Sequence, residues 1–532
     1  MTVSGPPQLP PLTPEAHRWQ TVKTNPRRVQ RRSVGAEAIV GLEAQNSKGQ
    51  YDLYMVATLQ SSVTSTASST VLTLSHLKEK FELALLTARF QHPECAATVL
   101  WDDQVPAIIS YEAPESDKVA LAWAKNCVHV RLTVKSAYDV WAELEEERSA
   151  SNCTTPSKSF ELFLIANIEH QDAEIPARAC VDVLIHSNHL FWDGISSRMF
   201  VGELFRSLND LLGGPTGQQP PKFDWGEEVQ NLSPAIFDCL RLDVEALGTE
   251  FDDKCKEYTA ALVGNYGSRG LPFTPGLGFP RCELITLSAE KSKAIIKTIK
   301  TRLGPEYTIT HLAQAAIVLA LLDTLKPDDL TDDEFFVTPT SVDGRRWMEK
   351  EVANRFHPMC QTAAVVRVDH LKSIHVSHED TKETQVEALE HACRDVKASY
   401  DRWLKNPYQL ALGLRVHNFE ANYLKANPVP FQKGAANPLF ISDGVNERFL
   451  PRDITCGATG ETLFTIEKFV FLVNQILPYL GVRLDSWRDA STVSIIYNEA
   501  HYTQAVVQAF LKSVIDFMLA FIESSETLSS ST

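Results

Sequence analysis

The sequence feature that most constrains the fold is a strand pattern that runs through a short turn into a helix pattern. Residues 180–187 alternate apolar and polar side chains, which is the period of a half-buried strand. After the turn at residues 188–194, apolar side chains recur at helical spacing. We expect the following residues on the inner face of that helix: Ile195, Met199, Leu204, Leu208 and Leu211. Such a unit predicts an α/β fold in which side chains of the turn converge on a cleft.

Helix and strand patterns alternate along the rest of the chain. Helical spacing predicts a helix over 77–88 that Ser75 can cap. We also expect an apolar, buried helix over 310–325, a charged helix over 383–404 and a closing helix over 501–522. We expect strands over 160–168, 335–339, 363–368 and 493–497. Loops are expected over 61–70 and 422–437, and residues 465–482 are apolar without a clear period. The pattern indicates an α/β class with mixed strand directions.

The length of the chain predicts two lobes, because 532 residues exceed what one hydrophobic core usually holds. The stretch 213–226 is rich in glycine and proline, which suits the end of the preceding helix and a connection between lobes. We therefore expect an N-terminal lobe over 1–212, a linker over 213–226 and a C-terminal lobe over 227–532.

Charge and cysteine content exclude several classes of partner. The formal net charge of −16 disfavours a nucleic acid or an anionic membrane surface, both of which attract basic patches. The ten cysteines form no CxxC pair, so we expect neither a zinc site nor a disulfide framework.

The first residues lack the basic and then apolar pattern of a signal peptide. We expect a cytoplasmic monomer that binds no metal, no nucleic acid and no membrane.

The turn carries a motif in which His189 and Asp193 form an HxxxD pair. The spacing alone indicates little, since His391 and Asp395 repeat it inside the charged helix, where a pair on a solvated helix face explains it. The first pair differs because Gly194 follows it, because it lies between a strand and a helix, and because apolar residues flank the histidine. These features favour a catalytic role for His189.

A neutral histidine suits the chemistry of acyl transfer. A hydroxyl that attacks a thioester must lose a proton, and histidine, with a pKa of about 6.5, accepts protons well near neutral pH. Asp193 can act on the histidine directly, or it can hold the turn through a buried ion pair. Segment 342–346 (VDGRR) offers Arg345 as the partner for this second role.

Rival catalytic schemes find less support in the sequence. The chain contains no GxSxG nucleophile elbow, no GxxxxGK[ST] phosphate loop and no HExxH zinc motif. None of the ten cysteines lies in a recognisable motif, although an acyl-cysteine mechanism stays open.

Several segments resemble one enzyme superfamily. Residues 189–194 (HLFWDG) are similar to the motif of the chloramphenicol-acetyltransferase-like superfamily, which includes plant BAHD acyltransferases and nonribosomal peptide condensation domains. Segment 342–345 resembles the BAHD VDxR element, whose arginine pairs with the motif aspartate. Residues 354–359 (NRFHPM) fall where relatives begin a strand, and 453–457 (DITCG) stand where BAHD enzymes carry DFGWG.

Within this superfamily the sequence is most similar to fungal trichothecene 15-O-acetyltransferases, on residues 223–229 (FDWGEEV), 342–346 and 442–444. The resemblance implies two similar lobes with mixed sheets and a tunnel between them. Acetyl-CoA would enter from one face and a small-molecule alcohol from the other, and both would meet at His189. The acceptor would be a hydroxyl of a fungal secondary metabolite such as a trichothecene-like terpenoid.

The resemblance also implies roles for individual residues. Asp193, Gly194 and Arg345 would support the active-site loop without touching the substrate. The oxyanion of the reaction needs a hydrogen-bond donor. We take Ser442 and Asp443 as candidates for contact with the oxyanion or with the acceptor.

Two other functions remain open on the sequence. One is a condensation-like enzyme that forms an amide or catalyses a non-acyl step on a polyketide or terpenoid. Condensation domains usually carry two adjacent histidines, whereas the first position here is Asn188, and the chain has no carrier-protein motif. Both facts favour a free-standing acyltransferase. The other alternative is a non-catalytic interaction protein of the same fold.

Overall fold

The computed structural model describes residues 13–46, 52–62, 72–101, 106–150, 158–212, 219–264, 268–426, 435–457, 459–475 and 477–529. Most of the predicted loop 61–70 and the first part of the predicted linker 213–226 lie outside these ranges.

The described ranges contain helices and strands throughout. The helices are α1 (Ala36–Asn46), α2 (Leu74–Gln91), α3 (Asp117–Lys125), α4 (Ala137–Ala150), α5 (Gly194–Leu212), α6 (Thr249–Gly264), α7 (Ala289–Arg302), α8 (Ile309–Leu325), α9 (Lys350–Arg355), α10 (Lys382–Leu404), α11 (Gln409–Ala426) and α12 (Gln504–Ser529). The strands are β1 (Gln20–Val22), β2 (Asn25–Arg32), β3 (Leu53–Ser61), β4 (Thr98–Leu100), β5 (Ile108–Glu112), β6 (Val128–Leu132), β7 (Phe160–Ala166), β8 (Cys180–Ser187), β9 (Leu271–Pro272), β10 (Pro280–Leu287), β11 (Phe336–Val342), β12 (Thr362–Val368), β13 (Ala435–Ala436), β14 (Leu439–Val445), β15 (Asp453–Thr455), β16 (Thr462–Val473), β17 (Gly481–Trp487) and β18 (Ala490–Asn498).

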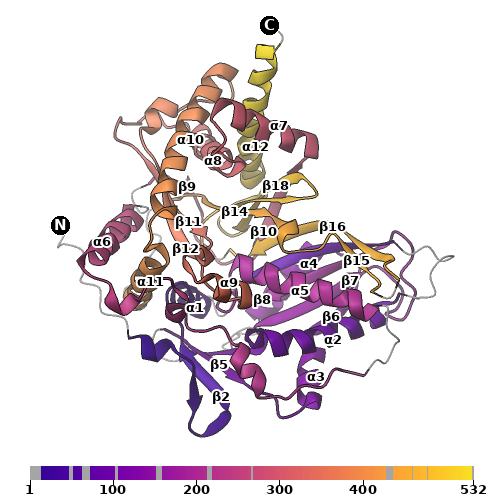
Figure 1. The fold of residues 1–532 in the computed structure, drawn as a ribbon. Coiled ribbons are helices and arrows are strands. Elements are labelled where there is room, and N and C mark those ends of the chain that lie inside the picture. Colours follow the sequence, from indigo (N-terminus) through magenta and orange to yellow (C-terminus); the bar gives the residue numbers. More distant parts are fainter. Residues whose placement is uncertain are drawn as a thin grey trace.

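One lobe is built on a six-stranded sheet of order β15-β16-β3-β8-β7-β6 (Figure 1). Side chains of β3 alternate between its two faces, as the strand period requires. Leu53 and Met55 join the core that includes α2 and α5, whereas Tyr54 and Val56 pack toward Trp141 of α4. The sheet therefore lies between α2 and α5 on one face and α4 on the other.

The second lobe contains a four-stranded sheet of order β10-β18-β17-β14 and the pair β11-β12 (Figure 1). Its central helix, α8, is apolar all round and is fully buried between Leu312 and Leu322, as expected for a core helix. Helix α12 packs against α8 and α10. Residues Gln504–Ile522 of α12 are long and apolar enough to cross a membrane, but just over half of the stretch is buried inside this lobe.

Strand directions are mixed in both large sheets. The pairs β6-β7 and β14-β17 are parallel, and the other pairs of these sheets are antiparallel. The predicted α/β fold with mixed sheets is confirmed.

Segments that follow the first lobe in the sequence return to pack against it. Strands β15 and β16 come from the C-terminal part of the sequence, yet β16 pairs with β3 of the first lobe. On the other side, Phe223 of the predicted linker stacks on Phe90 of α2, and Trp225 donates a hydrogen bond to Asp117 of α3. The division into lobes over 1–212 and 227–532 with a linker over 213–226 stays a prediction. Strands β15 and β16 belong to the C-terminal part of the sequence but to the sheet of the first lobe.

Most predicted elements are confirmed, and a few details are wrong. The residue that caps α2 is Thr73, whose hydroxyl accepts from the N–H of His76, and Ser75 lies inside the helix. The inner face of α5 is rotated from the predicted one. Leu204 and Leu208 are buried as expected, but the following residues complete the face in place of Ile195, Met199 and Leu211: Phe200, Val201, Phe205 and Leu212.

The structure assigns secondary structure in two stretches that the sequence left unassigned or predicted wrongly. Residues 465–482 form most of β16 and the start of β17. Of the loop predicted over 422–437, residues 422–426 belong to α11 and residues 435–436 to β13, so the prediction is wrong there. Residues 427–434 lie outside the described residues.

Candidate active site

His189 lies in the turn between β8 and α5, where only 7% of its surface is exposed. Its Nδ1 lies 2.9 Å from the carbonyl oxygen of Trp192. A carbonyl can only accept, so Nδ1 carries the proton in the neutral ring. The lone pair of that ring is therefore on Nε2, the atom that can take a proton from a substrate.

Burial lowers the pKa of His189 below its usual value of 6.5. The Trp192 carbonyl, which accepts from Nδ1, and the charges of Asp193 and Asp52 act in the opposite direction. Because burial is the larger effect, the imidazole is neutral near pH 7 and can act as a base.

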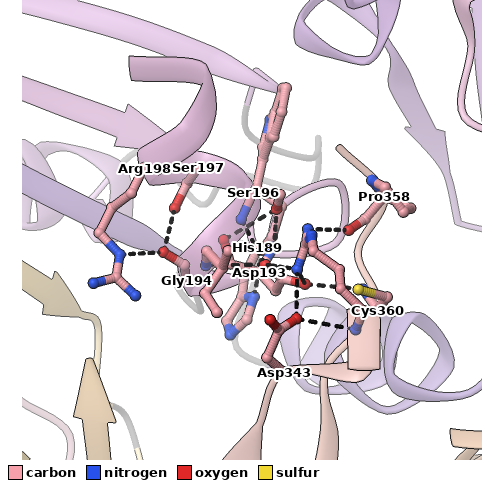
Figure 2. Close-up of polar contacts among 12 residues, drawn as sticks. His189, Asp193, Gly194, Ser196, Ser197, Arg198, Asp343, Pro358 and Cys360 are labelled. Carbon is pink, nitrogen blue, oxygen red and sulfur yellow. Dashed lines mark hydrogen bonds and ion pairs between the residues drawn. The ribbon is translucent and has the colours of Figure 1, made fainter. Parts of the chain in front are cut away.

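Both carboxylate oxygens of Asp193 are held by neighbouring groups (Figure 2). Oδ1 accepts from the N–H of Ser196 at 2.7 Å and so caps the first turn of α5. Oδ2 accepts from the N–H of Cys360 at 2.9 Å and lies 3.3 Å from Arg345. Burial alone would raise the pKa of Asp193, but the charge of Arg345 and these hydrogen bonds hold it at about 2. Asp193 is an ionised anchor between the two lobes.

The VDGRR segment supplies the other half of this anchor. Arg345 lies in a short helical turn, η7 (Gly344–Trp347), and donates a further hydrogen bond to the carbonyl of Pro358 at 2.9 Å. At Gly344 the backbone passes so close to Cys360 that an added Cβ would lie 1.8 Å from its carbonyl oxygen. Only glycine fits there, because any side chain would displace the segment that binds Asp193.

A cavity of about 820 Å³ opens beside His189 and is lined by residues of both lobes. The predicted tunnel, with an opening on each face, stays a prediction. All the site residues predicted from the sequence line this cavity: His189, Asp193, Gly194, Arg345, Ser442 and Asp443. The hydroxyl of Ser442, on β14, lies 2.8 Å from that of Thr310 in the first turn of α8. The cavity therefore presents a pair of hydroxyl groups as well as the histidine.

A buried ion network, which sequence reasoning missed, borders the cavity next to Gly194. Arg198 donates to the carbonyls of Gly194 at 2.6 Å and Asp443 at 2.8 Å. The Asp443 carboxylate accepts from Arg483 at 2.7 Å. These ion pairs favour a structural role for Asp443, and its predicted contact with oxyanion or acceptor stays a prediction. Arg198 follows Gly194 by one helical turn, and this spacing is the sequence signal that could have identified it.

The same network contains an unusual acid. Asp485 of β17 is buried and accepts a hydrogen bond from Asn446 at 2.9 Å. Burial, together with the charge of Asp443, raises the pKa of Asp485 to about 7. Its ionisation thus changes the charge of the network near neutral pH.

A cluster of two histidines and a glutamate joins the lobes on another side. Nε2 of His92 and Nε2 of His357 lie 2.7 and 3.0 Å from the carboxylate of Glu203 on α5. Within the described ranges these groups bring three possible metal ligands within 4.8 Å of one another. The imidazole rings are stacked 4.2 Å apart at 12°. Because a carboxylate only accepts, both Nε2 atoms donate their protons to Glu203 in this arrangement. This geometry favours a hydrogen-bonded clasp.

The comparisons with known proteins agree on one family. The model of the family described as 15-O-acetyltransferase Tri3 matches residues 9–421. The chain is 59% identical to the trichothecene 15-O-acetyltransferase TRI3 of Fusarium sporotrichioides, over 98% of this chain and the whole of that protein. The chain belongs to the Tri3 family. The solved structure of the Fusarium enzyme superposes with a TM-score of 0.91, covering 96% of this chain and 99% of that one.

As a member of the Tri3 family, the chain is an O-acetyltransferase. A condensation domain of a calcium-dependent antibiotic synthetase shares the fold, with a TM-score of 0.57 at 12% identity over 93% of this chain and 97% of that one. The predicted two-lobed fold is confirmed, and so is the predicted similarity to trichothecene 15-O-acetyltransferases. The comparisons do not favour the amide-forming or non-catalytic alternatives, because the close relatives of this Tri3-family chain are O-acetyltransferases.

Proposed function

We propose that this chain transfers the acetyl group of acetyl-CoA to the 15-hydroxyl of a trichothecene, with His189 as the general base. The observation that carries the proposal is the orientation of the imidazole. Its Nδ1–H donates to the Trp192 carbonyl, so the neutral ring carries its basic lone pair on Nε2, and His189 lines the cavity. The 15-position is favoured by the family description and by the Fusarium relative.

The reaction needs one base that later acts as an acid. Nε2 of His189 takes the proton of the acceptor hydroxyl as its oxygen attacks the acetyl carbonyl. The tetrahedral intermediate then collapses, the carbon–sulfur bond breaks, and the imidazolium returns the proton to the departing thiolate. The ester and free coenzyme A are formed, and His189 is neutral again.

The oxyanion of the intermediate requires a hydrogen-bond donor. The hydroxyl of Ser442 lines the same cavity as His189, and it shares a hydrogen bond with Thr310. That partner can hold the Ser442 hydroxyl in place, since one of the two must donate to the other. A single donor at this position contributes about 3–4 kcal/mol to such a transition state.

Positive charge for the phosphates of the coenzyme is present at the cavity despite the acidic composition. Arg346 and Arg448 are exposed and line the cavity. A guanidinium group can bind a phosphate through two parallel hydrogen bonds. Their charge supports acetyl-CoA as the acyl donor.

The proposal is tested with purified protein, acetyl-CoA and a trichothecene that has a free 15-hydroxyl. We expect release of free thiol together with the 15-O-acetyl product, identified by mass and NMR. The matched control is the same trichothecene already acetylated at position 15, which should release no thiol. Thiol release from that control at an equal rate, or release with amines alone, would contradict the proposal. A chelator should leave the rate unchanged. The cytoplasmic location and monomeric state stay predictions.

A further inference from the structure

A second buried aspartate, Asp52, contacts the active-site turn near its N-terminal end. Asp52 immediately precedes β3, whose first residue, Leu53, pairs with Ser187 at the end of β8. The turn with His189 leaves the sheet at that same end. Asp52 has no exposed surface, and its Oδ1 lies 3.4 Å from the backbone N–H of His189. Asp52 thus contacts the backbone of His189 although the two residues lie far apart in the sequence.

Two cationic or polar groups hold the Asp52 carboxylate in place. Its Oδ2 accepts from Arg148 of α4 at 2.8 Å and from Nε2 of His186 at 2.8 Å. The backbone carbonyl of Asp52 also accepts from the N–H of Asn474 at 2.8 Å. A carboxylate removed from water is stable only with such partners. Its position is therefore determined by α4, β8 and the chain after β16.

The turn is held at both ends by an aspartate–arginine ion pair. Asp193 with Arg345 holds its C-terminal end, and the VDGR segment signals that pair in the sequence. Asp52 with Arg148 holds its N-terminal end, and 137 residues separate the aspartate from His189. We propose that Asp52, fixed by Arg148, is a second positioning residue for catalysis, which orients the turn so that the imidazole of His189 faces the cavity.

The charge of Asp52 also acts on the base. Burial lowers the pKa of His189, and the charges of Asp193 and Asp52 partly offset that effect. Loss of the Asp52 charge therefore lowers the pKa of His189 further, because the imidazolium form loses a nearby anion. This electrostatic effect distinguishes the positioning role from a purely structural one.

Other charged groups surround the imidazole. Behind it, His186 and Glu145 adjoin the Asp52–Arg148 pair. On the cavity side the charged lining residues are Asp193, Arg198, Glu306, Asp343, Arg345, Arg346, Lys397, Asp401, Asp443, Arg448 and Arg483. None of these is altered in the variants below, so their contribution is the same in every comparison.

The inference rests on the proposed role of His189, and it is tested by the pH dependence of kcat/KM in Asp52→Asn. We expect kcat to fall about tenfold, since small displacements of a catalytic group cost at least that much. The KM for acetyl-CoA should stay within twofold. The acidic limb of kcat/KM should move to lower pH by roughly half a unit. An acidic limb that stays within 0.1 unit of the wild-type position would overturn the inference.

Two further variants complete the test. Asp182→Asn removes the same charge from the same pair of strands, where Asp182 accepts from Thr58, and should change neither kcat nor the limb. Arg148→Lys keeps the cation but loses the guanidinium geometry, so kcat should fall severalfold with the limb unmoved. If Asp52→Asn does not fold, Arg148→Lys decides, and an unchanged kcat overturns the inference. An inactive wild type would instead refute the proposed function, which separates the two failures.

Discussion

Two segments of this chain share the HxxxD spacing and lie in different surroundings. His189 and Asp193 belong to a turn between β8 and α5 and line the cavity. His391 and Asp395 lie one turn apart on α10, and neither is among the cavity-lining residues. The carboxylate of Asp395 accepts from the backbone N–H of Asp369 at 3.2 Å.

The comparison shows which surroundings distinguish a candidate active site from the same HxxxD spacing on a helix face. On α10 the helix keeps both side chains on one half-buried face. In the turn, the ring of His189 donates a hydrogen bond to the carbonyl of Trp192, and the buried Asp193 pairs with Arg345 of the other lobe. The copy at His189 is therefore distinguished by its contacts with distant segments, and each prediction below removes or disturbs one of those contacts.

The largest effect is expected for Asp193→Ala compared with Asp395→Ala. Loss of the Asp193 carboxylate leaves Arg345 buried without its main counter-charge, which should lower the free energy of unfolding by about 3–5 kcal/mol. Asp395→Ala removes one hydrogen bond and should cost about 0.5–1 kcal/mol. Urea denaturation of both variants measures the difference. Equal losses of stability would show that the two copies are held alike.

A smaller effect is expected for Gly344→Ala. The new Cβ would overlap the carbonyl of Cys360, so η7 and the segment that donates to Asp193 must separate, at a cost of about 1–3 kcal/mol. Gly248→Ala is the control, since nothing lies within 4 Å of its added Cβ. Thermal denaturation and initial rates should both fall in the first variant and stay near wild type in the second. Wild-type rates in Gly344→Ala would remove the VDGR segment from the account.

The smallest effect is expected for Arg345→Lys compared with Arg394→Lys. Lysine can keep the charge opposite Asp193 but loses the hydrogen bond to Pro358, which should cost about 1–2 kcal/mol and some activity. Arg394 lies within the second HxxxD segment and pairs with Glu390 on the surface, where such an exchange costs less than about 0.5 kcal/mol. The difference between the two stabilities, measured in urea, should survive addition of salt, because only the buried pair is shielded from it.

Patterns within short stretches of sequence predicted most helices and strands, and they predicted the site residues that lie in motifs. Helix α8 is visible in the sequence as a long apolar run, and α10 because its buried face recurs at helical spacing within a few residues. The cap of α2 was misplaced because Thr73 and Ser75 are both good capping residues. The type of β16 could not be read, because its partner β3 lies about 400 residues earlier and nothing local records that pairing.

The site divides in the same way. His189, Asp193 and Arg345 lie in motifs with a recognisable spacing. Asp443 and Arg198 meet across 245 positions, and Asp52 meets His189 across 137. Such contacts follow from the packing of whole sheets. The sequence therefore indicates the base and its motif partner, whereas the groups that orient them emerge only from the folded chain.

The central claim, that Nε2 of His189 is the base, is tested most directly by kcat for acetyl transfer to the trichothecene in His189→Ala beside His391→Ala. Both proteins should fold, as checked by circular dichroism and melting temperature. We predict a loss of about 10²–10⁴-fold in His189→Ala, the usual contribution of a general base. His391→Ala should stay within about twofold of wild type, as expected for a residue on a half-buried helix face. A His189→Ala protein that keeps a tenth or more of wild-type turnover would contradict the account.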